Sequence, residues 1–98
     1  MVQQNLEQQN TAVEGIQEHR AHIDEIDKQI VSLLNRRTQH ALAIRALKPE
    51  AHMGLYDPRR EEEIFSRVYG FNEGPLYNDS LREIYQGILK VMKEIPSL

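Results

Sequence analysis

Isoleucines recur every seven residues through the first half of the chain, a spacing typical of one face of a long amphipathic helix. The isoleucines of this register are Ile16, Ile23, Ile30 and Ile44. A fifth position of the same register holds Arg37, which carries a permanent positive charge. Because Pro49 disfavours a helical conformation in the residue before it, we expect the first helix to run from about Val13 to about Lys48.

A second, shorter helix is predicted to begin at an Asp-Pro pair. Asp57 is a good N-cap, and Pro58 suits the first helical position because its missing N–H is not needed there. We expect this helix to end near Tyr69. Its buried face is expected to contain Ile64, Phe65 and Val68. Residues 49–56 precede it and form a loop in which Gly54 is available for a positive φ.

A third helix is expected after a loop at residues 70–77, which contains glycine and proline. Asn78 or Ser80 can cap the helix, and Ser80 with Glu83 has the spacing of a capping box. Pro96 limits the helix at its end. Its apolar face is expected to contain Leu81, Ile84, Tyr85, Ile88, Leu89, Met92 and Ile95.

One long and two shorter helices, with no strand pattern, predict an all-α fold. Residues 1–12 are polar and lack apolar periodicity, so we expect a disordered tail there and a single helical domain over residues 13–98. A chain of 98 residues buries only about 60–65% of its unfolded surface. Two short helices cannot cover so long an apolar stripe. We therefore expect a homodimer formed through the first helix.

The composition limits the chemistry that this chain can perform. Cysteine is absent, which excludes disulfides, thiolate metal sites and cysteine nucleophiles and fits a cytoplasmic protein. No apolar run approaches the roughly 20 residues that cross a bilayer, so we expect no membrane span. The net charge of −3 favours neither nucleic acid nor an anionic membrane. Any anion-binding site must therefore be local.

Arg37 indicates such a site, because an unpaired charge within a buried seam costs about 3–5 kcal/mol. Lys48 follows it by 11 positions, which is about 16 Å along a helix and on nearly the same face. Both side chains can reach one small anion. Arg20 lies 28 positions before Lys48, or about 42 Å away along the helix. If Arg20 shares the ligand, it comes from a second, antiparallel chain, and the dimer has two equivalent sites.

Each of these residues also has a simpler interpretation. Arg37 can pair with an acid of a neighbouring helix, and Arg20 can lie on the surface beside Glu18 or Asp24. Lys48 can be a lysine favoured by the helix dipole. Asp57 can simply be an N-cap, and Arg60 and Glu61 can be solvated residues of an early helical turn.

The runs HRAHIDEIDKQIVSLLNRR and YDPRREEEI, with Lys48 between them, resemble the all-helical class of chorismate mutases. The resemblance covers about residues 16–95. The residues that fall at the spacing of that family are Arg20, Asp27, Arg37, Lys48, Asp57, Arg60 and Glu61. Members of the family are intertwined homodimers of three-helix subunits, and they convert chorismate into prephenate on the route to phenylalanine and tyrosine.

The resemblance implies a role for each residue. Arg37 and the partner's Arg20 would bind the two substrate carboxylates, and Lys48 would reach a carboxylate and the ether oxygen. The site would be framed by Asp57, Arg60 and Glu61. Glu61 would accept a hydrogen bond from the substrate hydroxyl and act with Lys48 and Arg37 as a catalytic residue. The reaction is a 3,3-sigmatropic rearrangement, so the resemblance implies no cofactor and no metal.

The third helix departs from the family pattern. Where the family places a small or hydroxyl residue and, one turn later, Gln or Glu, this chain has Met92 and Pro96. Neither side chain can make a polar contact with the ether oxygen, and Glu94 is expected to point elsewhere. Two alternatives to a chorismate mutase therefore stay open: an isochorismate-pyruvate lyase, and a non-catalytic dimerisation or regulatory module.

Overall fold

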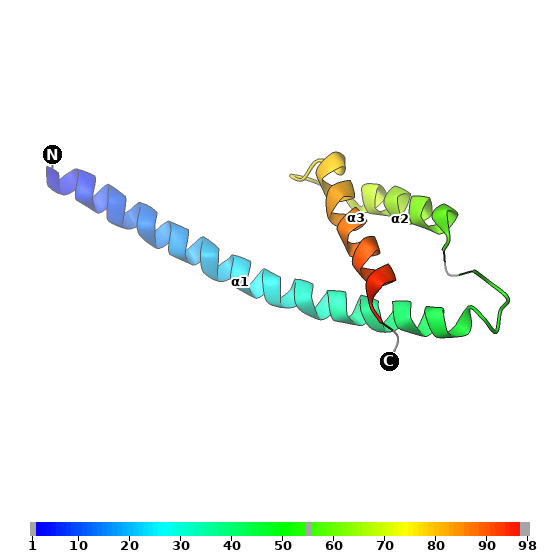
Figure 1. Cartoon of the computed structure of the whole chain (residues 1–98). Helices are drawn as coiled ribbons and strands as arrows, with labels where there is room; N and C mark the ends of the chain where they lie inside the picture. Colours follow the sequence, from blue (N-terminus) through cyan, green and yellow to red (C-terminus); the bar gives the residue numbers. More distant parts are fainter. Residues whose placement is uncertain (1, 55, 97–98) are drawn as a thin grey trace. The chain divides into compact units, whose positions relative to one another are not determined.

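The computed structural model describes residues 2–54 and 56–96, which form three helices (Figure 1). The long helix α1 spans Val2–Leu47, and it is followed by α2, Pro58–Phe71, and α3, Asn78–Glu94. No strand occurs in the described part of the chain. The prediction of an all-α fold with one long and two shorter helices is therefore confirmed.

Helix α1 begins at Val2, so the predicted start at about Val13 was wrong. The structure assigns helix to residues 2–12, where we expected a disordered tail, and Met1 lies outside the described residues. This segment contains neither glycine nor proline, and its Gln, Glu and Leu residues are good helix formers. The hydroxyl of Thr11 donates to the carbonyl oxygen of Glu7 at 2.9 Å within the helix. Helix propensity thus extends α1 beyond the region of apolar periodicity.

The chain divides into two compact units, Met1–Arg37 and Thr38–Leu98, and α1 crosses the boundary between them. In the first unit the isoleucine register is exposed in the chain taken alone. Ile16, Ile23 and Ile30 retain between 47% and 54% of their accessible surface. The seam that we expected to be buried is therefore not buried by its own chain. A single helix offers its apolar stripe no covering element.

In the second unit, α2 and α3 pack against each other around a small core. Among the described residues, the buried hydrophobic side chains are Phe65, Val68 and Leu89. Phe65 and Val68 come from the predicted face of α2, and Ile64 beside them is half-buried. The end of α2 at Phe71 lies two residues beyond the predicted one.

The start of α3 differs from the prediction. Its N-cap residue is Tyr77, which makes no side-chain cap hydrogen bond, so neither Asn78 nor Ser80 caps the helix. The carboxamide oxygen of Asn78 instead accepts from Asn72 Nδ2 at 2.8 Å. Asn78 thus stabilises the loop between the helices. The end of α3 at Glu94, before Pro96, agrees with the prediction.

The last turn of α3 is fixed to the C-terminal part of α1 within the second unit. The Thr38 hydroxyl donates to Met92 Sδ at 3.4 Å, and Arg45 Nη2 donates to the Met92 carbonyl oxygen at 2.5 Å. The Arg45 guanidinium also donates to the carbonyl oxygen of Ile95. These contacts supply donors to carbonyls that a helix end leaves without a partner in the helix.

The loop after α1 contains a left-handed residue. His52 has a φ of 56°, and its N–H donates to the Pro49 carbonyl oxygen at 3.1 Å. The N–H of Met53 donates to the Lys48 carbonyl oxygen at 2.9 Å. This pair of hydrogen bonds is a Schellman motif. The positive φ predicted for Gly54 is found two residues earlier, at His52.

Candidate functional site

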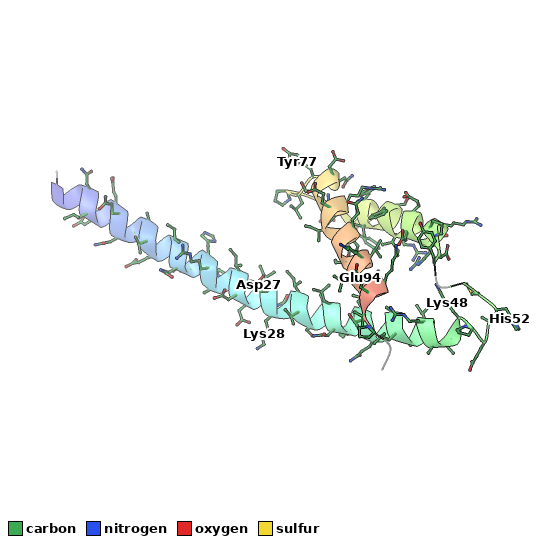
Figure 2. All side chains as sticks on the ribbon, viewed as in Figure 1. Asp27, Lys28, Lys48, His52, Tyr77 and Glu94 are labelled. Carbon is green, nitrogen blue, oxygen red and sulfur yellow. The ribbon has the colours of Figure 1, made fainter. Side chains whose placement is uncertain are left out.

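The predicted site residues lie in both units of the chain. Arg20 is exposed and Arg37 is half-buried in the N-terminal unit of α1, where Asp27 also lies (Figure 2). Within residues 2–37, neither arginine forms an ion pair. The exposure of Arg20 agrees with the simpler interpretation, in which this residue lies on the surface of the helix. Lys48 is half-buried just after the end of α1, in the second unit (Figure 2).

Asp57 caps α2, as the sequence predicted. One carboxylate oxygen accepts from the backbone N–H of Arg60 at 3.1 Å, and Pro58 occupies the first turn of the helix. The Arg60 guanidinium lies 3.4 Å from the Glu63 carboxylate, and both side chains are about half exposed, at 50% and 51%. The cap therefore places Arg60 and Glu61 side by side at the start of α2. In this chain alone, Arg60 occupies a solvated first turn.

Glu61 is more enclosed than Glu62 and Glu63 on the same helix, with 23% of its side-chain surface exposed against 69% and 51%. Its Oε1 lies 2.5 Å from Nζ of Lys93, on the last turn of α3. The ammonium group of Lys93 also lies 5.0 Å from the centre of the Tyr56 ring, within reach of a cation–π interaction. The hydrogen bond to Glu61 raises the pKa of Lys93 above its ordinary value.

Sequence reasoning missed Lys93. Lys93 was not among the predicted site residues, and periodicity within α3 alone carries no sign of a partner on α2. The only available signal was the opposite charge of Glu61 and Lys93. It becomes informative only once α2 and α3 are known to pack together.

A cavity of about 310 Å³ lies between α2 and α3. This volume is at the lower end of the range for small-molecule sites. Its walls are formed by Glu61, Glu62, Phe65, Arg82, Gln86, Leu89, Lys90, Lys93 and Glu94. Three acids and three bases line it, so the cavity does not carry charge of one sign.

Glu94 is among these lining residues and lies on the last turn of α3 (Figure 2). Glu94 lines the same cavity as Glu61, and the expectation that its side chain points away from the substrate's ether oxygen stays a prediction. The helix continues through Glu94 before it ends at Ile95 and Pro96. Glu94 is therefore the last residue of α3.

The opposite wall of the cavity is fixed by Arg82. Its guanidinium lies 4.2 Å from the centre of the Phe65 ring and donates to the Tyr69 hydroxyl at 3.1 Å. It also lies 3.3 Å from the Glu62 carboxylate. The hydrogen bond to Tyr69 is the main cause of a raised pKa for Arg82. These contacts connect α2 to the first half of α3.

Two further properties concern the part of the chain that the structure describes. No group of three or more His, Cys, Asp or Glu residues is arranged there to hold a metal ion. None of the described helices combines the length and the apolar character that a bilayer crossing requires.

Comparison with known proteins places this arrangement in a family. Residues 19–96 match the family described as chorismate mutase type II. A bifunctional chorismate mutase/prephenate dehydratase of Neisseria gonorrhoeae is 39% identical over 71 residues, which cover 72% of this chain and 19% of that protein. A protein of the same description from Aquifex aeolicus is 35% identical over 81 residues, which cover 79% of this chain and 22% of that protein. The chain thus spans about a fifth of the length of these relatives.

The fold has a counterpart among solved structures. A structure of chorismate mutase (form II) from Thermus thermophilus superposes with a TM-score of 0.78 at 30% sequence identity. The match covers 82% of this chain and 91% of that chain. The helical arrangement described above is therefore an established one.

Proposed function

We propose that this chain, which belongs to the chorismate mutase type II family, catalyses the rearrangement of chorismate to prephenate. The family match over residues 19–96 confirms the resemblance that the sequence indicated over about residues 16–95. The observation that carries the proposal is that the matched residues 19–96 contain the six residues predicted to bind the substrate. These are Arg20, Arg37, Lys48, Asp57, Arg60 and Glu61.

In this proposal, charge and shape perform the catalysis. The rearrangement breaks one C–O bond and forms one C–C bond within a single molecule, so no nucleophile or proton transfer is required. Arg37 and the partner's Arg20 hold the two carboxylates, which keeps the flexible dianion in a compact conformation. Lys48 places positive charge where the ether oxygen becomes electron rich. Removing a donor of this kind typically lowers the rate by about 10²–10³.

The start of α2 supplies the remaining groups of the proposed site. The carboxylate of Asp57 caps the helix, and this contact sets the direction in which Arg60 and Glu61 leave the backbone. Glu61 lines the cavity and is largely enclosed, which suits an acceptor for the substrate hydroxyl. In the proposal, Asp57 and Arg60 frame the site.

The active form in this proposal is an intertwined homodimer. The exposed stripe formed by Ile16, Ile23 and Ile30 supports it, since a second copy of α1 would remove this apolar surface from water. The length of the helix also supports it, because Arg20 is too far from Lys48 along the helix to share a small ligand with it. Each dimer would contain two sites. A cytoplasmic location stays a prediction from the cysteine-free composition.

The test is to incubate the purified protein with chorismate and to follow both substrate loss and product identity. Prephenate formation well above the uncatalysed rate is the expected result. Salicylate and pyruvate as products would identify an isochorismate-pyruvate lyase when isochorismate is supplied instead. Substrate loss no faster than in buffer would favour the non-catalytic module. Sedimentation equilibrium of the same sample measures whether the protein is a dimer.

A further inference from the structure

The last turn of α3 carries one cation that contacts a proposed catalytic residue. Lys93 Nζ lies 2.5 Å from Glu61 Oε1, and it lies 5.0 Å from the ring centre of Tyr56. The ammonium group thus connects three segments: the loop before α2, the first turns of α2 and the end of α3. Lys93 itself is 52% exposed, so its partners, rather than burial, hold it in place.

Lys93 lies in the part of the third helix that departs from the family pattern. Its neighbours Met92 and Pro96 occupy the places where a polar side chain of the third helix was expected, and neither can contact a substrate oxygen through a strong hydrogen bond. Lys93 is the side chain of this turn that contacts Glu61. Lys93 thus links the last turn of α3 to Glu61.

We propose that Lys93 is a positioning residue of the active site, whose ammonium group engages one oxygen of the Glu61 carboxylate and presents the other oxygen to the substrate hydroxyl. The inference rests on the proposed function, because it assigns Glu61 the role of hydroxyl acceptor. A carboxylate has two acceptor oxygens, so a single carboxylate can accept from Lys93 and from a substrate at once.

The charges around Glu61 explain why such a partner is needed. A doubly anionic substrate approaching a carboxylate is repelled by it, and a cation at 2.5 Å offsets that repulsion. The other charged or titratable groups near Glu61 in the sequence are the N-cap Asp57 and, on α2, Arg60, Glu62 and Glu63. Those that face the cavity or the ion pair from α3 and from the preceding loop are Arg82, Lys90, Glu94 and Tyr56. Of these groups, none forms an ion pair with Glu61 among the described residues.

A double-mutant cycle tests the inference. Lys93→Met is expected to lower kcat/KM about tenfold, which is the size of a charged hydrogen bond. In a Glu61→Gln background, the same substitution should change kcat/KM by less than about twofold, since Lys93 acts through Glu61. Lys93→Arg should retain most of the activity because a guanidinium can make the same contact.

Arg67→Met is the control, because it removes a positive charge from α2 at an exposed position that does not line the cavity. Its kcat/KM should stay within about twofold of the wild type. Circular dichroism checks that every variant is folded, and Lys93→Gln replaces Lys93→Met should the latter not fold. Equal losses for Lys93→Met in both backgrounds, or a loss no larger than for Arg67→Met, would overturn the inference alone. A wild-type protein without turnover would overturn the proposed function and the inference with it.

Discussion

Arg45 donates a 2.5 Å hydrogen bond from Nη2 to the backbone carbonyl oxygen of Met92, between the end of α1 and the last turn of α3. A second hydrogen bond from the same guanidinium reaches the carbonyl oxygen of Ile95. The partly buried guanidinium of Arg45 thus donates to two carbonyl oxygens at the end of α3. The contact fixes the end of α3, which carries Lys93 and its ion pair with Glu61.

Replacing Arg45 should therefore destabilise the protein. Arg45→Met is expected to lower the free energy of unfolding by about 2 kcal/mol, because part-buried carbonyls lose a charged donor. Urea denaturation followed by circular dichroism measures the change. Arg67→Met, which removes an exposed arginine from α2, is the control and should change the free energy by less than about 0.5 kcal/mol. Equal effects of the two substitutions would contradict the role of Arg45.

The cap of α2 leads to a second prediction. Asp57→Ala removes the acceptor for the N–H of Arg60, so the free energy of unfolding should fall by about 1 kcal/mol. Asp57→Ser should retain most of the stability, because serine is also a good N-cap. Thermal denaturation of the three proteins measures the order. A serine variant as unstable as the alanine variant would show that the carboxylate does more than cap the helix.

His52 leads to a prediction in the opposite direction. Its φ of 56° is a left-handed conformation that costs a residue with a Cβ about 1 kcal/mol or more. His52→Gly should therefore raise the free energy of unfolding by roughly 0.5–1 kcal/mol. His52→Ala keeps the Cβ and is expected to show no gain. A stabilising alanine variant would mean that the imidazole, rather than the backbone, is the source of strain.

The ion pair of Lys93 should be visible in the pH dependence of stability. The contact with Glu61 raises the pKa of Lys93 above its ordinary value of 10.5, so the folded protein holds this proton more tightly than the unfolded chain. Its contribution is fully present below pH 10.5 and is lost as the pH rises through the higher folded pKa. The difference in urea midpoint between wild type and Lys93→Met should accordingly shrink only above about pH 10.5.

Lys93→Arg provides the control for this titration. A guanidinium stays charged over the whole range, so the midpoint difference between Lys93→Arg and Lys93→Met should persist where that of the wild type declines. A wild-type difference that is already lost near pH 9 would contradict a raised pKa for Lys93.

Periodicity and local signals predicted much of this fold, and the errors have physical causes. The Asp-Pro start of α2 and the end of α3 before Pro96 depend on neighbouring residues, so they could be predicted from the sequence. The start of α1 could not be predicted from apolar spacing, because a helix of good formers needs no apolar face. Asn78 is a good cap by type, but the loop side chain of Asn72 uses its oxygen.

In the candidate site, too, the features that depend on neighbouring residues could be predicted from the sequence. Arg60 and Glu61 follow a local cap and lie in the first turn of α2, as predicted, while their contacts with a substrate stay a prediction. The contact between Glu61 and Lys93 depends on how α2 packs against α3, which no pattern within either helix encodes. A site that contains both Arg37 and Arg20 requires Arg20 to come from a second chain, so this shared site stays a prediction.

The last prediction tests whether the two arginines of one site come from different chains. Arg20→Ala and Arg37→Ala homodimers should each be nearly inactive, because every site lacks one carboxylate-binding guanidinium. In a heterodimer of the two variants, one site carries both substitutions and the other carries neither. An equimolar mixture at exchange equilibrium contains about one half heterodimers with one intact site each, so it should recover about one quarter of the wild-type activity.

Mass spectrometry of the intact dimers verifies that subunits have exchanged, and each variant mixed with itself is the control. Recovery requires that the two arginines of a site belong to different chains. If both arginines came from one chain, every site in the mixture would lack one of them and activity would stay at the level of the separate variants. Full exchange without recovery would therefore exclude a shared site, even if the wild type proves to be an active dimer.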